Sequence, residues 1–373
     1  MKMLYTSSAS FPSTRAHSVQ IMNMSEAFAE CSDFLLLAGK LKEDPEKIFG
    51  MYGISKPFKV TSSGWPFAFG RLLIFWTTFR GYWIAKKFKP DILYVREFIL
   101  CYLISKLWRW RIALEVHSIP QRHASIFKKA LLRADKIIVT NEAKRLEILN
   151  KFSIPSEKIL LARNGVDVGE FSSVEASKVE LRNKLDLPID KKLFGFAGQF
   201  TAKGLDKGLL TTLQAFSKTP EDFFLVFVGG GEKELNSYKQ AAKNYGIEKK
   251  LILHGQVPHS EVPKWLKAMD FLIFPYSPLN EHLIYYMSPI KIAEYMASGT
   301  PIITSDLPAV KEILPDDMAT YFKAGDTDDF ALKINWSIQN LSECLSKAEL
   351  AAKKALEFSW QKRAEKILKF LKK

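Results

Sequence analysis

Short apolar runs alternate with helix-length stretches along this chain, and the alternation restricts the fold more than any other sequence feature. In the first half the runs are KMLY, DFLLLAG, DILYVRE, RIALEVH and KIIVTN. After a polar break at 170–188 they are LFGFAG, FFLVFVGGG, KLILHGQV, DFLIFPY, TPIITSD and MATYFK. Segments between them, such as SVQIMNMSEAFAEC, GLLTTLQAF and EVPKWLKAM, have helical periodicity. Strands alternating with helices predict an α/β protein with parallel sheets and crossover helices.

The break in this pattern predicts two doubly wound domains. A chain of 373 residues is long for one core and sufficient for two. We expect domains at 1–170 and 171–356, with a basic amphipathic helix at 357–373 that packs back on the first domain. Ligands of such sheets bind beyond the carboxyl ends of the strands, so the loops there are the candidate sites.

Charge is distributed unevenly between the two halves. Residues 1–185 contain 29 Lys and Arg against 17 Asp and Glu, whereas residues 186–373 contain 25 against 23. A basic first half predicts an anionic partner, for which nucleic acid, an anionic membrane surface and a phosphorylated acceptor are the alternatives.

An aromatic segment at 65–89, WPFAFGRLLIFWTTFRGYWIAKKFK, is the strongest membrane candidate. Arg71 and Arg80 interrupt it, which argues against a spanning helix. Its aromatic face and lysine-rich end suit a helix lying in a headgroup layer, and KLWRWR at 106–111 adds to this hypothesis. The alternative is a helix packed beneath its own sheet.

The cysteines and the first residues of the sequence suggest the cellular compartment of the protein. Cys31, Cys101 and Cys344 are widely spaced and odd in number, which suits a reducing compartment without disulfides or zinc. The sequence turns polar soon after its start, unlike a signal peptide. We therefore expect a cytoplasmic protein, with peripheral contact at the inner face of the membrane.

Glycine and lysine follow the strand run LFGFAG, in GQFTAKGLDKG. Glycines allow backbone N–H groups to approach an anion, and a lysine there suits a diphosphate. A second glycine-rich turn, VGGGEKELNSY, lacks the spacing of a dinucleotide fingerprint, and the chain has no P-loop motif. Hydride transfer and P-loop chemistry are therefore excluded.

Three further motifs lie at strand or helix ends. His117, in LEVHSIP, is either a hydrogen-bonded structural residue or a functional one at a strand's carboxyl end. The loop HGQVPHS could bind the edge of a base through its backbone. Asp326 and Asp328 are predicted to form a helix N-cap region, and we expect no metal.

Taken in order, these motifs resemble a known family. FPSTRAHSVQIMNMSEAFA, DILYVRE, LEVHSIP, RNGVDVGEF, VGGGEKELNSY, SPIKIAEYMASGTPIITSDLPAVKEIL and the closing FSW match the family-four retaining glycosyltransferases along nearly the full chain. The resemblance implies the GT-B architecture, in which two Rossmann-like parallel-sheet domains face a deep cleft. It also implies transfer of a sugar from a nucleotide-diphosphate sugar with retention at the anomeric carbon, without a metal or other cofactor.

The resemblance assigns the two expected catalytic residues. Lys207 matches the family lysine that contacts the diphosphate, and its spacing to Ala215 and Phe216 favours it over Lys203. His117 matches the first-domain histidine that contacts the donor sugar near the reaction centre.

The resemblance also assigns the donor-binding residues. Glu294 matches the glutamate that binds the ribose hydroxyls. The other expected positions follow the chain. The first lies in the loop that closes over the phosphates, the next two in the two glycine-rich turns at strand ends, two more in the base-reading loop, and the last three in the loop that contacts the sugar and the β-phosphate. They are Arg15, Gln199, Gly230, Gln256, Val257, Ser288, Pro289 and Ile290.

Two positions depart from the family pattern. Tyr286 stands where the family usually has a second glutamate, and Gln199 stands where many members have an arginine. We expect Lys291 to compensate for the lost positive charge. The missing glutamate normally contacts the sugar, so the sequence does not identify the sugar.

Taken together, the sequence predicts a retaining hexosyltransferase that modifies a glycan or lipid-linked acceptor in envelope polysaccharide synthesis. No flanking pair of carboxylates supports double displacement, so we expect same-face attack. The alternatives are a two-domain nucleotide-sugar epimerase and a non-catalytic nucleotide-sugar binding protein. A nucleic-acid binder is disfavoured, because the chain lacks an aromatic and basic strand motif for RNA.

Overall fold

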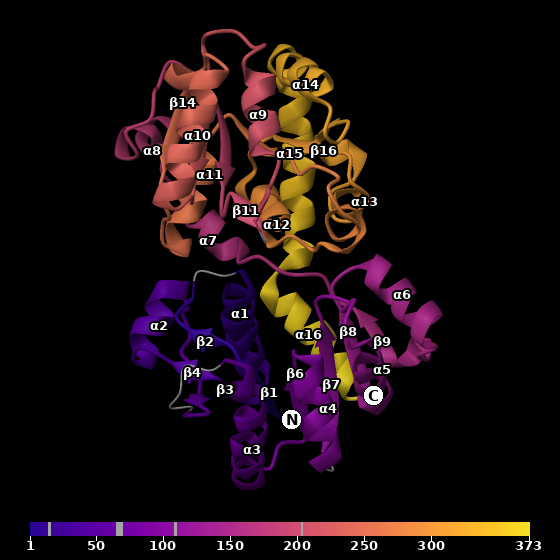
Figure 1. The fold of residues 1–373 in the computed structure, drawn as a ribbon. Helices are drawn as coiled ribbons and strands as arrows, with labels where there is room; N and C mark the ends of the chain where they lie inside the picture. The colour runs from indigo at the N-terminus through magenta and orange to yellow at the C-terminus, as the bar shows by residue number, and fades with distance from the viewer. Residues whose placement is uncertain (14–15, 65–69, 108–109, 203) are drawn as a thin grey trace. The chain divides into compact units, whose positions relative to one another are not determined.

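The computed structural model of the 373-residue chain describes all residues except 14–15, 65–69, 108–109 and 203. It divides into two compact units, and each is described by itself. The first unit comprises Met1–Gly165 and Trp360–Lys373, and the second comprises Val166–Ser359 (Figure 1). The expected boundary after residue 170 lies inside helix α7 (Val168–Ser172) of the second unit.

A seven-stranded parallel sheet forms the first unit. Its strand order is β5-β3-β1-β6-β7-β8-β9, so the first strand of the sheet lies centrally and the strand order reverses between β1 and β6. The strands are β1 (Lys2–Thr6), β3 (Asp33–Ala38), β5 (Val60–Ser62), β6 (Ile92–Val95), β7 (Arg111–Val116), β8 (Lys136–Val139) and β9 (Ile159–Leu161). Two short strands, β2 (Ser10–Phe11) and β4 (Lys40–Leu41), pair separately.

Helices connect these strands, as parallel pairing requires. They are α1 (Ala16–Cys31), α2 (Pro45–Tyr52), α3 (Gly70–Phe88), α4 (Phe98–Leu107), α5 (Ala124–Arg133) and α6 (Glu142–Phe152). The last helix of the chain, α16 (Trp360–Leu371), packs against α1 in this unit. The guanidinium group of Arg111 donates a hydrogen bond to the Leu371 carbonyl oxygen at 3.1 Å.

A six-stranded parallel sheet forms the second unit, in the order β14-β13-β10-β15-β16-β17. The strands are β10 (Lys192–Ala197), β13 (Phe223–Val228), β14 (Leu251–His254), β15 (Phe271–Phe274), β16 (Ile302–Ser305) and β17 (Thr320–Phe322). Here too the first strand is central, and the order reverses between β10 and β15. A separate hairpin joins β11 (Thr201–Ala202) to β12 (Leu205–Asp206).

The helices of the second unit vary in length. They are α7, α8 (Lys178–Lys184), α9 (Leu209–Phe216), α10 (Glu232–Asn244), α11 (Val262–Ala268), α12 (Ile290–Ser298), α13 (Pro308–Lys311), α14 (Thr327–Gln339) and α15 (Leu341–Ala355). Single turns lie at Glu248–Lys250, His259–Glu261, His282–Tyr286, Asp316–Met318 and Leu356–Phe358, and the first unit has one at Ser156–Lys158. Among the helices of the described residues, none has the length and apolar character needed to cross a bilayer.

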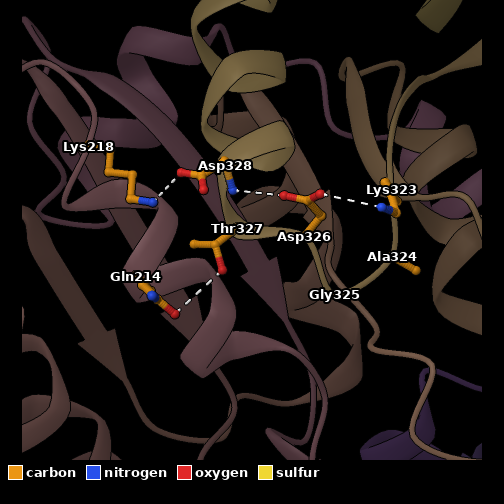
Figure 2. A pocket seen from close by; sticks show the side chains of 8 residues that line it. All are labelled: Gln214, Lys218, Lys323, Ala324, Gly325, Asp326, Thr327 and Asp328. Atoms are coloured by element: carbon orange, nitrogen blue, oxygen red, sulfur yellow. Dashed lines mark hydrogen bonds and ion pairs between the residues drawn. The ribbon is translucent and has the colours of Figure 1, made fainter.

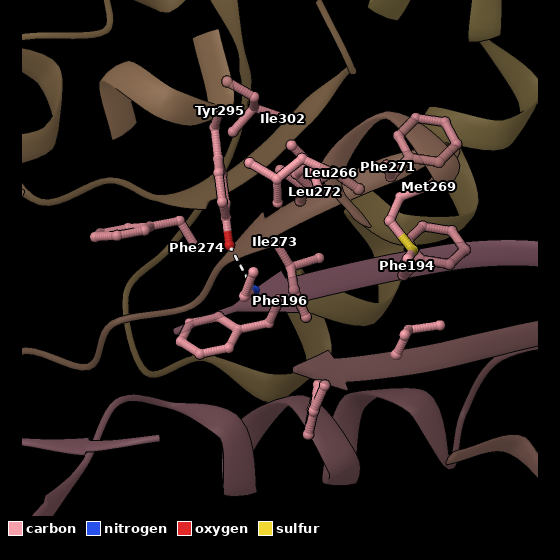
Figure 3. Packing of buried hydrophobic residues seen from close by; sticks show 14 of the residues in the cluster. Phe194, Phe196, Leu266, Met269, Phe271, Leu272, Ile273, Phe274, Tyr295 and Ile302 are labelled. Atoms are coloured by element: carbon pink, nitrogen blue, oxygen red, sulfur yellow. Dashed lines mark hydrogen bonds between the residues drawn. The ribbon is translucent and has the colours of Figure 1, made fainter. Parts of the chain in front are cut away.

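Aromatic side chains fill the core beneath the central strand of this sheet. The Phe194 ring stacks on the Phe271 ring with centroids 5.1 Å apart. Tyr295 of α12 points toward the strand, where its hydroxyl oxygen accepts a hydrogen bond from the Ala197 N–H at 3.3 Å (Figure 3). This packing fixes α12 against the end of β10, which is where the candidate site lies.

The predicted α/β architecture is confirmed in both units, because every apolar run quoted above forms a strand of a parallel sheet. The sequence did not predict the edge strands β5 and β9. The polar segment 170–188 was expected to lack regular structure between the two domains, whereas α8 begins within it, with a capping box between Ser177 and Glu180. The S-x-x-E pattern is the sequence signal for that helix start.

Candidate functional site

Glycines shape the loops after β10 and β13. Gly198 (φ 124°) and Gly229 (φ 119°) both have left-handed backbone conformations. A Cβ on Gly229 would lie 2.8 Å from the carbonyl oxygen of Gly198, and one on Gly230 would lie 2.4 Å from a ring carbon of Phe200. The two loops therefore approach closely because these positions lack side chains.

Lys207 lies between the β11–β12 hairpin and helix α9. Its Nζ donates a hydrogen bond to the carbonyl oxygen of Gln199 at 2.7 Å. Burial lowers the pKa of Lys207 to about 8, although Glu234 opposes the shift. The two residues expected at the diphosphate therefore lie together, joined through the Gln199 backbone.

Lys291 lies on the first turn of α12 and reaches the same loop. Its Nζ is 3.4 Å from the centroid of the Phe196 ring. A Cβ on Gly198 would lie 2.7 Å from that Nζ. Burial, followed by the charge of Lys207, lowers the pKa of Lys291 well below its ordinary value, and Glu294 only partly opposes this. Two lysines and one carboxylate thus act on one another at the carboxyl edge of the sheet; we call Lys207, Lys291 and Glu294 the charged cluster.

A histidine that the sequence did not predict holds Glu294. His259 Nε2 lies 2.8 Å from Glu294 Oε1, and its Nδ1 lies 3.9 Å from Glu170 Oε2. Burial alone would lower the pKa of His259, but the hydrogen bond and charge of Glu294, with the charge of Glu170, raise it. The only sequence hint was its position at the end of the predicted base-reading loop, HGQVPHS.

The other predicted donor-binding residues lie on loops around this edge of the sheet. Gln256 is exposed and Val257 half-buried after β14, an edge strand two positions from β10. Tyr286 ends a π-helical turn, His282–Tyr286, before α12. Pro289 is the N-cap of α12, Ile290 is its first residue and Ser288 precedes them. Arg15 lies outside the described residues.

His117 belongs to a pocket of the first unit, with a volume of about 450 Å³, at the ends of β6 and β7. Polar lining comes from His17, Arg96, Glu97, Glu115, His117 and Ser118, and apolar lining comes from Ile74, Phe98, Ile99, Leu114, Val116 and Phe127. Ser7 and Ser8, after β1, hydrogen-bond to Glu97 Oε1 with their hydroxyl groups at 2.8 and 3.0 Å. The pocket therefore adjoins the strand-order reversal between β1 and β6, where doubly wound sheets bind ligands.

Beneath this pocket lies a buried ion pair. Glu115 is fully buried and its Oε1 pairs with the Arg363 guanidinium of α16, while Gln20 donates to the same oxygen at 3.1 Å. Burial alone would raise the pKa of Glu115, but Arg363 and His117 hold it well below its usual value. Arg363 had no sequence signal, because its partner lies 248 residues away.

His117 contacts the same buried carboxylate. Its Nε2 lies 3.0 Å from Glu115 Oε1. Burial, together with the positive charge of Arg96, lowers the pKa of His117 to about 3. The imidazole is therefore neutral at physiological pH, and it can serve both as a structural partner of Glu115 and as a lining group of the pocket.

A second pocket, of about 410 Å³, surrounds the start of α14. Figure 2 shows Lys218 reaching Asp328 and Gln214 reaching Thr327 across it. Asp326 accepts hydrogen bonds from the N–H groups of Asp328 and Asp329, which confirms the predicted N-cap. Within the described ranges, no group of three or more His, Cys, Asp or Glu side chains is placed to hold a metal ion.

Comparison with known proteins identifies the family. Residues 19–170 match the model "Glycosyltransferase Family 4", and residues 177–355 match "Glycosyl transferases group 1". Alpha-monoglucosyldiacylglycerol synthase from Streptococcus pneumoniae is 27% identical over 199 residues, which are 52% of this chain and 42% of that protein. The chain spans less than half the length, 42–47%, of four curated relatives that it matches.

Solved structures share the fold over the whole chain. A glycosyltransferase from Rickettsia africae superimposes with a TM-score of 0.79 at 17% identity, covering 100% of this chain and 98% of that one. HepE from Anabaena, in complex with UDP, gives a TM-score of 0.74 at 17% identity and covers both chains completely. The sheets, their strand orders and the two consecutive family matches agree, and the chain belongs to the GT-B glycosyltransferases, with a Family 4 first half and a group 1 second half.

Proposed function

We propose that this protein is a retaining glycosyltransferase that transfers a hexose from a nucleoside-diphosphate sugar to a glycan or lipid-linked acceptor. The observation that carries the proposal is the charged cluster, in which two lysines and a carboxylate converge at the carboxyl edge of the second sheet. The lysines would bind the diphosphate and Glu294 the ribose hydroxyls. The UDP complex of the similarly folded HepE supports a nucleotide ligand.

In the proposed reaction the bond between the anomeric carbon and the phosphate oxygen breaks, and the acceptor oxygen bonds to that carbon on the same face. The acceptor proton passes to the departing diphosphate. Negative charge grows on the leaving oxygen, so cations fixed beside it lower the barrier. Lys207 is fixed in this sense, because the Gln199 carbonyl holds its ammonium group.

The remaining donor residues complete the proposal. Backbone groups at Ser288, Pro289 and Ile290 would contact the sugar and the β-phosphate, because the N-terminal end of α12 carries partial positive charge. Gln256 and Val257 would bind the base. His117 would contact the donor sugar as a neutral imidazole, and no metal or other cofactor is needed.

We assign the acceptor to the first unit. Its 450 Å³ pocket combines charged groups with an apolar wall, which suits a polar acceptor group joined to an apolar portion. The relative that makes a glucosyl diacylglycerol supports a lipid-linked acceptor. This assignment is consistent with a role in envelope polysaccharide or glycolipid synthesis.

The exposed face of α3 supports peripheral membrane contact. Phe75, Phe79 and Trp83 recur every four residues and are 56%, 54% and 54% exposed, so they line one helix face. Lys86 Nζ lies 5.5 Å from the Trp83 ring centroid. Aromatic rings beside lysines suit the interface of an anionic bilayer better than water.

Vesicle sedimentation tests the membrane contact. Wild-type protein should bind vesicles containing phosphatidylglycerol at low salt and bind pure phosphatidylcholine vesicles less. Replacing the three aromatics by Ser should abolish binding, as should Gln at Lys86, Lys87 and Lys89. Ser at exposed Leu332, Leu345 and Leu350 of the second unit is the control. Unchanged binding by the aromatic variant contradicts the contact.

Nucleotide titration and product analysis test the function. Calorimetry with UDP and GDP should detect binding that Glu294→Ala weakens markedly, since the ribose loses its carboxylate. With the nucleotide sugar that binds, NMR of the product should show an α-linkage from an α-donor, and turnover should require the acceptor. A sugar changed without any acceptor would indicate an epimerase, and a dissociation constant unchanged in Glu294→Ala would contradict the ribose role.

A further inference from the structure

The amine of Lys291 is buried without a hydrogen-bond partner among the described residues. Lys144 and Lys250, the lysines that are buried as whole residues in the described part of the chain, have partners. Lys144 Nζ donates to Thr140 Oγ1 at 2.8 Å, and Lys250 Nζ donates to the carbonyl oxygens of Thr219 and Pro220 at 2.9 and 2.8 Å. Lys291 Nζ instead faces the Phe196 ring and the backbone at Gly198.

An isolated buried ammonium group is costly, because nothing replaces the water it has lost. The charged groups around Lys291 do not relieve this cost. Lys207 repels the ammonium form, and Glu294 attracts it only in part. Glu294 Oε1 is already engaged by His259, behind which Glu170 lies. These surroundings therefore lower the pKa of Lys291 and shift its equilibrium toward the neutral amine.

The surroundings of this amine suit an anion. Gly198 and Gly229 bring backbone close to it, and α12, whose first turn carries Lys291, has its positive end there. Lys207 Nζ is held on the same loop by the Gln199 carbonyl. A phosphate oxygen placed here would give Lys291 the partner it lacks.

We propose that Lys291 takes up a proton when a nucleoside diphosphate binds, so that binding at this site is coupled to proton uptake from solvent. The inference rests on the proposed function, because it takes the diphosphate as the anion. In the step, the neutral amine gains one proton from the buffer and becomes an ammonium ion paired with an ionised phosphate oxygen. No covalent bond to the ligand forms.

This coupling makes donor affinity depend on pH with a definite sign. Between the pKa of Lys291 in the protein without nucleotide and its higher pKa in the complex, Lys291 must take up a proton each time a diphosphate binds, so affinity falls as pH rises. For one proton the dissociation constant rises up to about tenfold per pH unit. Lys207, whose pKa is about 8, adds to the effect in the same range, so variants must separate the two lysines.

Calorimetry in several buffers measures the coupling directly. UDP is titrated at pH 8 in buffers of different ionisation enthalpy, such as Tris, bicine and HEPES, and the slope of the observed enthalpy counts the protons taken up. Wild-type protein should take up about one or more protons. Lys291→Met, which keeps the length of the side chain, should lower that number by about one and weaken binding. Lys207→Met should still take up a proton through Lys291, though less completely, because burial remains as the larger cause of the lowered pKa of Lys291 while the repulsion by Lys207 is gone.

A thermal measurement on the unliganded protein distinguishes this role from a structural one. Lys291→Met removes an unpartnered amine and keeps contact with Phe196, so its Tm should equal or exceed that of wild type. A lower Tm would indicate that Lys291 serves packing and would overturn the proposal.

The titration separates failure of this inference from failure of the function. Binding of UDP without proton uptake, or uptake unchanged in Lys291→Met, overturns the inference and leaves the proposed function standing. If neither UDP nor GDP binds, the proposed function fails and the inference fails with it.

Discussion

Lys207 is the residue whose surroundings most resemble a prepared catalytic group. Its ammonium is held by the Gln199 carbonyl at 2.7 Å, so no large rearrangement is needed when charge develops on a leaving group nearby. The backbone of Gly208, the next residue, donates to Asp206 Oδ2 at 2.7 Å, which fixes the chain on that side.

Lys207→Met should therefore reduce turnover strongly while leaving the fold intact. Losing one preorganised donor typically costs about 3 kcal/mol, which corresponds to roughly a hundredfold in kcat. Steady-state kinetics with a saturating donor would measure the loss, and Lys243→Met, at an exposed position of α10, provides the control. Near-normal kcat in Lys207→Met would remove this residue from the mechanism.

His259 should make a pH-dependent contribution to stability. Its pKa is raised in the folded protein, so its pairing with Glu294 stabilises fully below pH 6.5 and is lost as pH rises through the folded pKa. The Tm difference between wild type and His259→Gln should thus be largest near pH 6 and shrink toward pH 9. A difference that grows with pH would contradict this pairing.

Single residues show clearly what the sequence could and could not predict. Lys207 and Glu294 were predicted because the motifs around them resemble those of a known family, and the structure brings both to one cluster around Lys291. His259 and Arg363 act through side chains that meet partners far away in the sequence, 35 and 248 residues off. No local pattern encodes such contacts.

At the level of elements, the turn into α9 depends on a glycine. Gly208 is the N-cap of α9 with φ 89°, and a Cβ there would lie 1.7 Å from the carbonyl oxygen of Pro275. Pro275 follows β15, so the close approach joins the loops on the two sides of the strand-order reversal. The geometry of Lys207, one residue earlier, depends on this contact.

Gly208→Ala should destabilise the second unit more than Gly299→Ala does. Both glycines have positive φ, but a Cβ on Gly299 would meet nothing within 4 Å. Gly299→Ala should therefore lower the free energy of unfolding only by the left-handed backbone strain of about 1–2 kcal/mol, whereas Gly208→Ala adds a steric clash to this strain. Urea unfolding followed by circular dichroism would compare them, and equal midpoints would contradict the steric argument.

Elements were predicted where the apolar pattern was strong and missed where it was weak. The central strands are continuous apolar runs, because both faces of a parallel sheet are covered. Val60–Ser62 and Ile159–Leu161 are three-residue edge strands, too short for a periodic signal. Helix α8 was missed because its signal lies in its cap rather than in an apolar stripe.

At the scale of the whole chain, the first unit is closed by a helix from the far end of the sequence. Arg363 of α16 pairs with buried Glu115 and also donates to the Arg163 carbonyl oxygen at 2.8 Å. The expectation that the last helix returns to the first domain came from its amphipathic pattern. No sequence pattern predicted the buried charge pair.

Arg363→Met should lower the free energy of unfolding of the first unit by about 3–5 kcal/mol, because it leaves Glu115 buried without its countercharge. Combining Arg363→Met with Glu115→Gln should restore part of the lost free energy of unfolding. Arg111→Met, which removes a guanidinium group that donates to the Leu371 carbonyl, should cost much less. Denaturant melts would test the series, and a harmless Arg363→Met would show that the pair is not needed.

The return of α16 also dictates the order in which the protein can mature on the ribosome. The first half of the polypeptide emerges early, yet Glu115 lacks its ion-pair partner Arg363 until residues Trp360–Lys373 have been synthesised. The second unit is uninterrupted from Val166 to Ser359 and can fold before then. A premature stop codon just before Trp360 should thus leave the second unit able to fold, although it is synthesised later, and should destabilise the first unit.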